Sequence, residues 1–169
     1  MLFPLDNKGN SSADFSTPAS SIPFKMTGHL PYVSTLIGDQ KVNLGLDSGT
    51  EATVILSRVL KNKIEHFSPS NRVIVRGVSQ KNRKQAHGFI DGIPVGNDFY
   101  SNLEIVLLNV PKLEGFGHVN LDGLLALSQL TDFRLALNYK KKMLYLWSEE
   151  KIEMASRQDT LYQKNVFKR

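Results

Sequence analysis

A chain of 169 residues with 41% hydrophobic and 22% charged residues has the size and composition of one globular domain with a buried core. It contains no cysteine, which excludes disulfides and cysteine-ligated zinc, and its net charge of +5 is scattered apart from Lys140–Lys142, a predicted solvated hairpin tip, so no nucleic-acid partner is expected. No apolar run approaches the roughly 20 residues of a membrane helix, so no membrane span is expected, and Met1–Leu5 is too short and lacks the basic start of a secretory signal.

The first half of the chain predicts several strands, two of them joined as a hairpin. Residues 1–21 are rich in Ser, Asn, Asp and Pro and predict a flexible N-terminal arm in front of a domain over residues 22–148. The turn residues Gly38 and Asp39 separate two β-rich runs, and Ser57 is a suitable cap for a short helix. The strands predicted here cover residues 22–26, 31–37, 41–46 and 53–56, and the helix covers residues 58–64.

The second half predicts a long hairpin, further strands and a closing hairpin. The long hairpin covers residues 72–90 with a polar tip at residues 79–84, a short helix is predicted over residues 124–130, and residues 149–169 are expected to form a tail with helical character. Loops or turns are expected at residues 68–71, 91–92, 96–98 and 113–119, and the other strands at residues 93–95, 103–108, 133–138 and 143–147. These patterns predict a mostly β fold.

One stretch carries residues suited to chemistry. An apolar run ends at the lone carboxylate of Asp47, and Ser48, Gly49 and Thr50 follow it. A buried acid is costly unless it is hydrogen-bonded, and here two hydroxyls flank it, while the glycine lets the backbone pass close to a neighbour. On these four residues alone, a type I turn with Asp in its first position is the simpler interpretation.

With the elements around this loop, the chain resembles the retropepsin-like aspartic proteases, the single-lobe, homodimeric branch of that family, and is more similar to its bacterial members. The resemblance covers residues 31–147: a hairpin, the Asp47–Thr50 loop, a long hairpin like a flap, and the apolar-Gly element at Gly123–Leu125 before a last strand pair. It implies a single-lobe acid-protease β-barrel with two or three short helices. Ala126 stands where similar relatives usually have Gly, and the basic tip differs from the viral flaps.

The resemblance implies an aspartic endopeptidase that hydrolyses peptide bonds. Asp47 would be the catalytic residue, Ser48 would reach across the dimer axis, Gly49 would let the two loops touch, and Thr50 would donate to the carboxylate. The chain has one such loop, so the second carboxylate is expected from Asp47 of a second copy, in a homodimer acting on a peptide or protein substrate. The residues expected under the loop are Gly123, Leu124 and Leu125, and those expected at the flap and cleft are Gly77, Val78, Ser79, Gln80 and Lys81.

Other residues give weaker signals. The four histidines show no metal-ligand spacing and are expected to be surface or locally bonded imidazoles, so no metal or cofactor is predicted. Asp122 lacks hydroxyl neighbours and is interpreted as an acid that leads a helix and caps or pairs. A second class of function stays open: a non-catalytic peptide-binding or scaffolding domain of the same fold.

Overall fold

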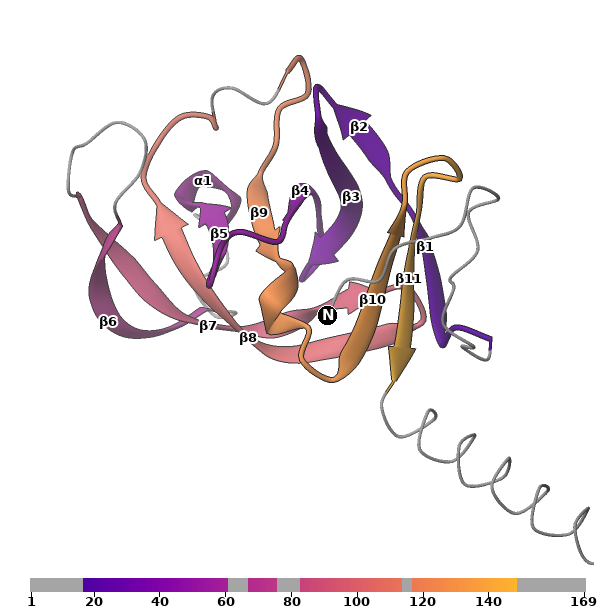
Figure 1. The fold of residues 1–169 in the computed structure, drawn as a ribbon. Helices are drawn as coiled ribbons and strands as arrows, with labels where there is room; N and C mark the ends of the chain where they lie inside the picture. The colour runs from indigo at the N-terminus through magenta and orange to yellow at the C-terminus, as the bar shows by residue number, and fades with distance from the viewer. Residues whose placement is uncertain (1–16, 61–66, 76–82, 114–116, 149–169) are drawn as a thin grey trace, which may run out of the picture. The chain divides into compact units, whose positions relative to one another are not determined.

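The structure, a computed structural model, describes residues 17–60, 67–75, 83–113 and 117–148 (Figure 1). Within these residues the chain is mostly β, as the sequence predicts. It divides into two compact units, one made of Phe24–Leu130 and the other of the segments Met1–Pro23 and Thr131–Arg169. The predicted flap-tip residues Gly77, Val78, Ser79, Gln80 and Lys81, the predicted tail over residues 149–169 and most of the predicted arm lie outside the described residues.

The unit that contains the chain's two end segments has a three-stranded antiparallel sheet in the order β1-β11-β10. The predicted closing hairpin is confirmed, and its second strand, β11, lies in the middle of this sheet. The sequence left open which face of that strand is buried; Leu144, Leu146 and Trp147 are the buried side chains. The predicted strand over residues 22–26 is not continuous: β1 begins at the buried Ser20 and ends at Pro23, and a separate strand begins at Lys25. The strands are β1 (Ser20–Pro23), β10 (Phe133–Asn138) and β11 (Met143–Ser148).

The other unit contains one sheet of eight strands in the order β2-β3-β4-β9-β5-β8-β7-β6. Among the described residues this order is linear, with β2 and β6 at its two ends, so the pairing does not close into the predicted barrel. The predicted strands over residues 31–37, 41–46 and 53–56 are confirmed within one residue at each end. The bounds are β2 (Lys25–Thr27), β3 (Leu30–Ile37), β4 (Gln40–Asp47), β5 (Thr53–Leu56), β6 (Phe67–Val75), β7 (Arg83–Val95), β8 (Asp98–Leu108) and β9 (Gly123–Ala126).

Where the sequence predicts a helix over residues 124–130, the structure has the strand β9 and a single 3₁₀ turn, η2 (Leu127–Gln129), so that prediction is wrong. β9 lies between β4, to which it is parallel, and β5, to which it is antiparallel (Figure 1). The sequence of a buried strand with partners on both sides is a continuous apolar run. A short buried helix has the same kind of sequence, so the pattern alone does not distinguish the two. The pairing partners, which lie far away in the sequence, decide between the two.

The loop and the turn predicted on either side of the long hairpin are also wrong. The predicted loop over residues 68–71 belongs to β6, which has a register shift between Pro69 and Asn71. Proline is tolerated there because β6 is the end strand of the sheet and the ladder is already irregular. The predicted turn at Asp91-Gly92 belongs to β7; Gly92 has a φ of 142°, and a Cβ atom on it would lie 2.1 Å from the Tyr100 carbonyl oxygen. Glycine is therefore required at this position because β7 and β8 approach each other closely, and not because the chain turns there.

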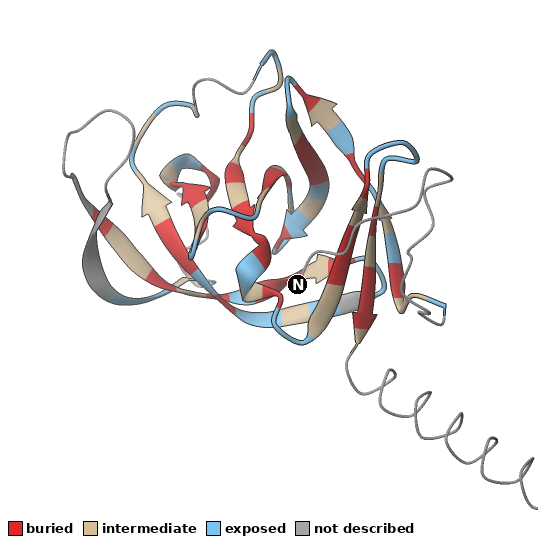
Figure 2. Cartoon of the chain, in the orientation of Figure 1, coloured by how far each residue is buried: buried red, intermediate tan, exposed pale blue. Residues whose placement is uncertain are grey.

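Apolar side chains of the central strands form the core of the larger sheet. Leu44, Ile55, Ile105 and Leu125 come from four neighbouring strands and are each at most 1% exposed. Figure 2 shows the buried parts of these strands in red. Full burial of such side chains contributes about 1.5–3 kcal/mol each. The helix predicted after β5 begins at the expected place as α1 (Ser57–Leu60), and the rest of its predicted length lies outside the described residues. This core fixes the ends of β4 and β5, between which the candidate site lies.

Candidate active site

Asp47 is the last residue of β4, and the loop that follows it leads into β5. Its carboxylate is partly exposed, and Oδ1 accepts a hydrogen bond of 2.7 Å from the Gly49 backbone N–H. An Asp side chain that bonds the backbone two residues ahead forms an Asx turn, which differs from the type I turn expected from the tetrapeptide. The bond also fixes the direction of the carboxylate at the end of a strand held by the core.

Of the other residues of the loop, two are exposed and one forms a hydrogen bond within the loop. Ser48 and Gly49 are exposed. The Thr50 hydroxyl donates to the Ala52 carbonyl at 3.0 Å. The predicted donation from Thr50 to the Asp47 carboxylate is therefore not what the structure shows, because the hydroxyl has one hydrogen and directs it elsewhere. The backbone of the loop, rather than the threonine, supplies the described hydrogen bond to Asp47.

The predicted apolar-Gly element lies directly beside the strand that carries Asp47. β9 runs parallel to β4, and its first residue, Gly123, is buried where β4, β9 and β5 meet. Ala126, the position that departs from the family pattern, is the register partner of Asp47 and is fully buried. The pairs along β4 and β9 are Leu44 with Gly123, Gly45 with Leu124, Leu46 with Leu125 and Asp47 with Ala126.

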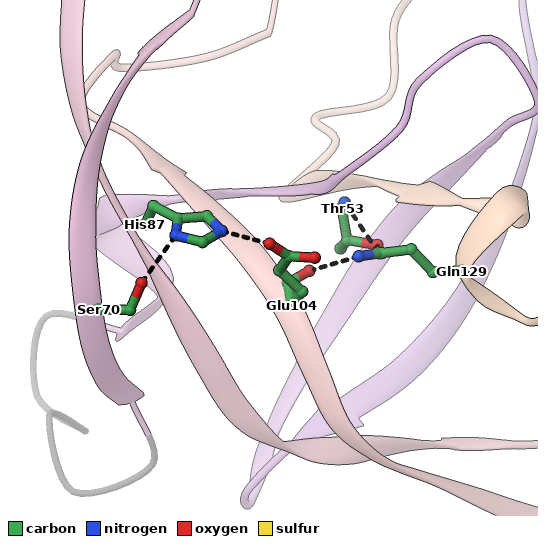
Figure 3. A network of polar contacts seen from close by, with 5 residues as sticks. All are labelled: Thr53, Ser70, His87, Glu104 and Gln129. Atoms are coloured by element: carbon green, nitrogen blue, oxygen red, sulfur yellow. Dashed lines mark hydrogen bonds and ion pairs between the residues drawn. The ribbon is translucent and has the colours of Figure 1, made fainter.

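A polar network that the sequence analysis missed holds the far end of the loop (Figure 3). Thr53 is fully buried; both its backbone N–H and its hydroxyl donate to Gln129 Oε1, at 3.0 and 2.5 Å. The same hydroxyl accepts from the Ala126 N–H at 3.1 Å, and Gln129 Nε2 donates to the Glu104 carbonyl at 3.0 Å. Ser128 donates to the Thr50 carbonyl at 2.9 Å. The sequence gives no signal for this network, because the burial of Thr53 and its contact with Gln129, 76 residues away, both depend on the fold.

We predict that Gln129→Leu lowers the free energy of unfolding by about 1–3 kcal/mol, because it leaves the buried Thr53 donors without their acceptor. Ser128→Ala, at the exposed neighbouring position, removes one hydrogen bond to a carbonyl and should cost less than about 1 kcal/mol. Urea denaturation of the two variants and the parent chain measures both values. Equal losses in the two variants would contradict a special role for Gln129.

Asp122 lies directly before β9, and both of its carboxylate oxygens have structural partners. Its Oδ1 lies 2.6 Å from Arg58 Nη2, and its Oδ2 accepts from the Asn43 N–H at 2.9 Å. The predicted pairing of Asp122 is confirmed, although the residue leads the strand β9 and not a helix. A carboxylate held on both oxygens joins β4 to α1 and is a poor candidate for a second catalytic acid.

The likeness to known proteins is structural and lies at low sequence identity. No family model matches the chain, and no curated protein matches it. Among solved structures, the chain is similar to the crystal structure of a retropepsin-like aspartic protease from Rickettsia conorii, with 15% sequence identity and a TM-score of 0.47 over 75% of this chain and 86% of that chain. A likeness of this degree carries no argument about activity.

The described ranges contain no group of three or more His, Cys, Asp or Glu residues arranged to hold a metal ion. They also contain no helix with the length and apolar character needed to cross a membrane.

Proposed function

We propose that this chain is one protomer of a homodimeric aspartic endopeptidase, whose catalytic dyad is formed by Asp47 from two copies. The observation that supports this most is the partly exposed Asp47 carboxylate, aligned by the Gly49 N–H at the end of a core strand. Asp122, on the neighbouring strand's leading end, is occupied by Arg58 and by the backbone of β4. In a two-fold dimer the same loop meets its own copy, which supplies the missing acid.

Two facing carboxylates that share one proton can perform both halves of peptide hydrolysis, because like charges so close together do not both ionise. The ionised carboxylate takes a proton from water as the water oxygen attacks the peptide carbonyl carbon. The protonated carboxyl donates its hydrogen to the carbonyl oxygen. When the tetrahedral intermediate collapses, the C–N bond breaks, the amine nitrogen receives the proton taken from water, and one hydroxyl of the intermediate returns its proton to the other carboxylate. The dyad then returns to its starting state.

The loop leaves room for a second copy. A Cβ atom built on Gly49 would meet only Asp47 Oδ1, at 3.3 Å, and otherwise open space. Ser48 next to it is exposed and free to reach a facing loop. The hydrogen bonds of Thr53, Gln129 and Ser128 fix the other end of the loop, so the carboxylate is presented from a rigid base.

A dilution experiment tests this proposal. The purified protein should cleave a mixed peptide library at acidic pH, where one carboxyl of the pair is protonated, and its activity per chain should fall on dilution. The reason is that a dissociated chain has one Asp47 and no dyad. Sedimentation over the same concentration range gives the fraction of dimer, and the two curves should coincide. Full activity in a solution of monomers would overturn the proposal.

One observation favours the second class of function, a peptide-binding or scaffolding domain without catalysis. The Thr50 hydroxyl donates to Ala52 and not to the catalytic carboxylate, so the acid has less local support than the resemblance implies. Such a domain would give the same sedimentation result and bind peptides from the library without cleaving them. Mass spectrometry of the library after incubation therefore separates the two functions.

A further inference from the structure

Three polar side chains on neighbouring strands form a chain of hydrogen bonds that the Asp47 site does not use (Figure 3). Ser70 lies on β6, His87 on β7 and Glu104 on β8. The Ser70 Oγ atom lies 3.0 Å from His87 Nδ1, and His87 Nε2 lies 2.5 Å from Glu104 Oε1. The three residues stand in the order hydroxyl, imidazole, carboxylate.

The chemistry of the partners assigns the hydrogens. An ionised carboxylate has only acceptor atoms, so the hydrogen of the His87–Glu104 bond belongs to Nε2. In a neutral imidazole, Nδ1 is then the bare nitrogen and accepts the hydrogen of the Ser70 hydroxyl. The serine is thus bonded to a base, and the base is oriented by an acid. This is the arrangement by which proteins activate a serine nucleophile.

The backbone of β6 is shaped to aim Ser70 at His87. The register pairs Pro69 with Gly88 and Asn71 with His87, so Ser70 is the extra residue of a bulge. Bulges re-aim side chains and recur beside active sites. A Cβ atom on Gly88 would lie 2.2 Å from the Ser68 carbonyl oxygen, so only glycine at this position lets the bulge approach β7 this closely.

The exposure of Ser70 and the apolar surroundings of His87 suit a reaction with a small molecule. Ser70 is exposed, whereas the His87 side chain is 15% exposed. The Phe89 ring packs edge-on against the imidazole with 6.2 Å between ring centroids, which gives the site an apolar side. β6 is the end strand of the sheet, so within the described residues no strand covers its outer edge.

We propose that Ser70, His87 and Glu104 form a second reactive site, at which Ser70 is acylated by small apolar carboxylic esters. The Ser70 oxygen bonds to the ester carbonyl carbon while its proton passes to His87 Nδ1. The ester C–O bond then breaks, and the leaving alcohol oxygen takes that proton. Water then attacks the acyl-serine carbonyl carbon and gives a proton to the same nitrogen; the bond from that carbon to the Ser70 oxygen breaks, His87 returns the proton to this oxygen, and the acid is released. Glu104 faces the positive charge that His87 carries between these transfers.

Covalent labelling of the full chain tests the site. The protein is incubated at neutral pH with p-nitrophenyl butyrate or with a fluorophosphonate probe, and the modified residue is located by mass spectrometry. The label should lie on Ser70 and be lost in Ser70→Ala. Ser68→Ala, at another exposed serine of the same strand, should be labelled at the parent rate. This readout is independent of peptide cleavage by Asp47.

Variants of His87 and Glu104 test whether the three residues form a reactive site or only a structural hydrogen-bonded cluster. His87→Asn should slow labelling of Ser70 by about a hundredfold, in line with the loss of a general base. Glu104→Gln should slow it less, since the neutral amide still accepts a hydrogen bond but does not balance the imidazolium charge. Circular dichroism and thermal unfolding identify any variant that does not fold. If Ser70 is labelled no faster than Ser68, or equally fast in a folded His87→Asn chain, the proposal is wrong.

Discussion

Replacing Asp47 by Asn should reduce peptide cleavage at acidic pH by about a hundredfold or more, because an amide neither takes a proton from water nor donates one to the substrate as an acid. The change adds no volume, and the amide oxygen can still accept the Gly49 N–H bond that holds the loop. Initial rates on one cleaved library peptide measure the effect. Asp39→Asn, the same change in the exposed turn between β3 and β4, is the matched control and should keep the parent rate.

Mixing the two chains makes this prediction sharper. If each active site needs two copies of Asp47, chains combined in all proportions and allowed to exchange should show activity that falls as the square of the parent fraction. Dimers with one Asn lack the shared proton and are inactive. A linear fall would mean that one Asp47 is enough for each site, which would contradict the dyad while leaving Asp47 as a catalytic residue.

Local signals were sufficient for the hairpin around Asp47. Turn residues separate the apolar runs at Gly38-Asp39 and again after Asp47, so the bounds of β3, β4 and β5 could be predicted from the sequence. The same runs place the acid at a strand end, which is why the candidate site could be proposed at all. The partner of the Thr50 hydroxyl could not be predicted, because Ala52 and Asp47 are both within reach of a short loop.

The elements that were predicted wrongly depend on strand pairing between segments that lie far apart in the sequence. The run after Gly123 is short and apolar, and only its position between β4 and β5 makes it a strand. Gln129 and Ser70 carry ordinary polar side chains whose partners lie 76 and 17 residues away, so the sequence gives no indication of either contact. The polar networks around the site are therefore products of the fold and not of any motif.

Replacing Gly123 by Ala should lower the free energy of unfolding by about 3 kcal/mol, a large part of the 5–15 kcal/mol typical of a folded chain. The added Cβ atom would lie 2.1 Å from the Val54 carbonyl oxygen and 3.1 Å from Leu44 Cδ2. Because the first of these atoms belongs to the backbone of β5, relief requires that two paired strands move apart. Urea denaturation of the variant and the parent chain measures the loss.

Gly45→Ala is the matched control, since Gly45 lies on the adjacent strand and is paired with Leu124. Its Cβ atom would also be crowded, with Leu30 Cδ2 at 2.6 Å and Leu124 Cδ2 at 2.9 Å, but both atoms are ends of flexible side chains. They can change rotamer, so we expect a loss of about 1 kcal/mol. If the two alanines cost the same, close contact between the backbones of β9 and β5 is not what excludes a side chain at Gly123. The hydrogen bonds of Thr53 and Gln129 would then be the main support of the loop that carries Asp47.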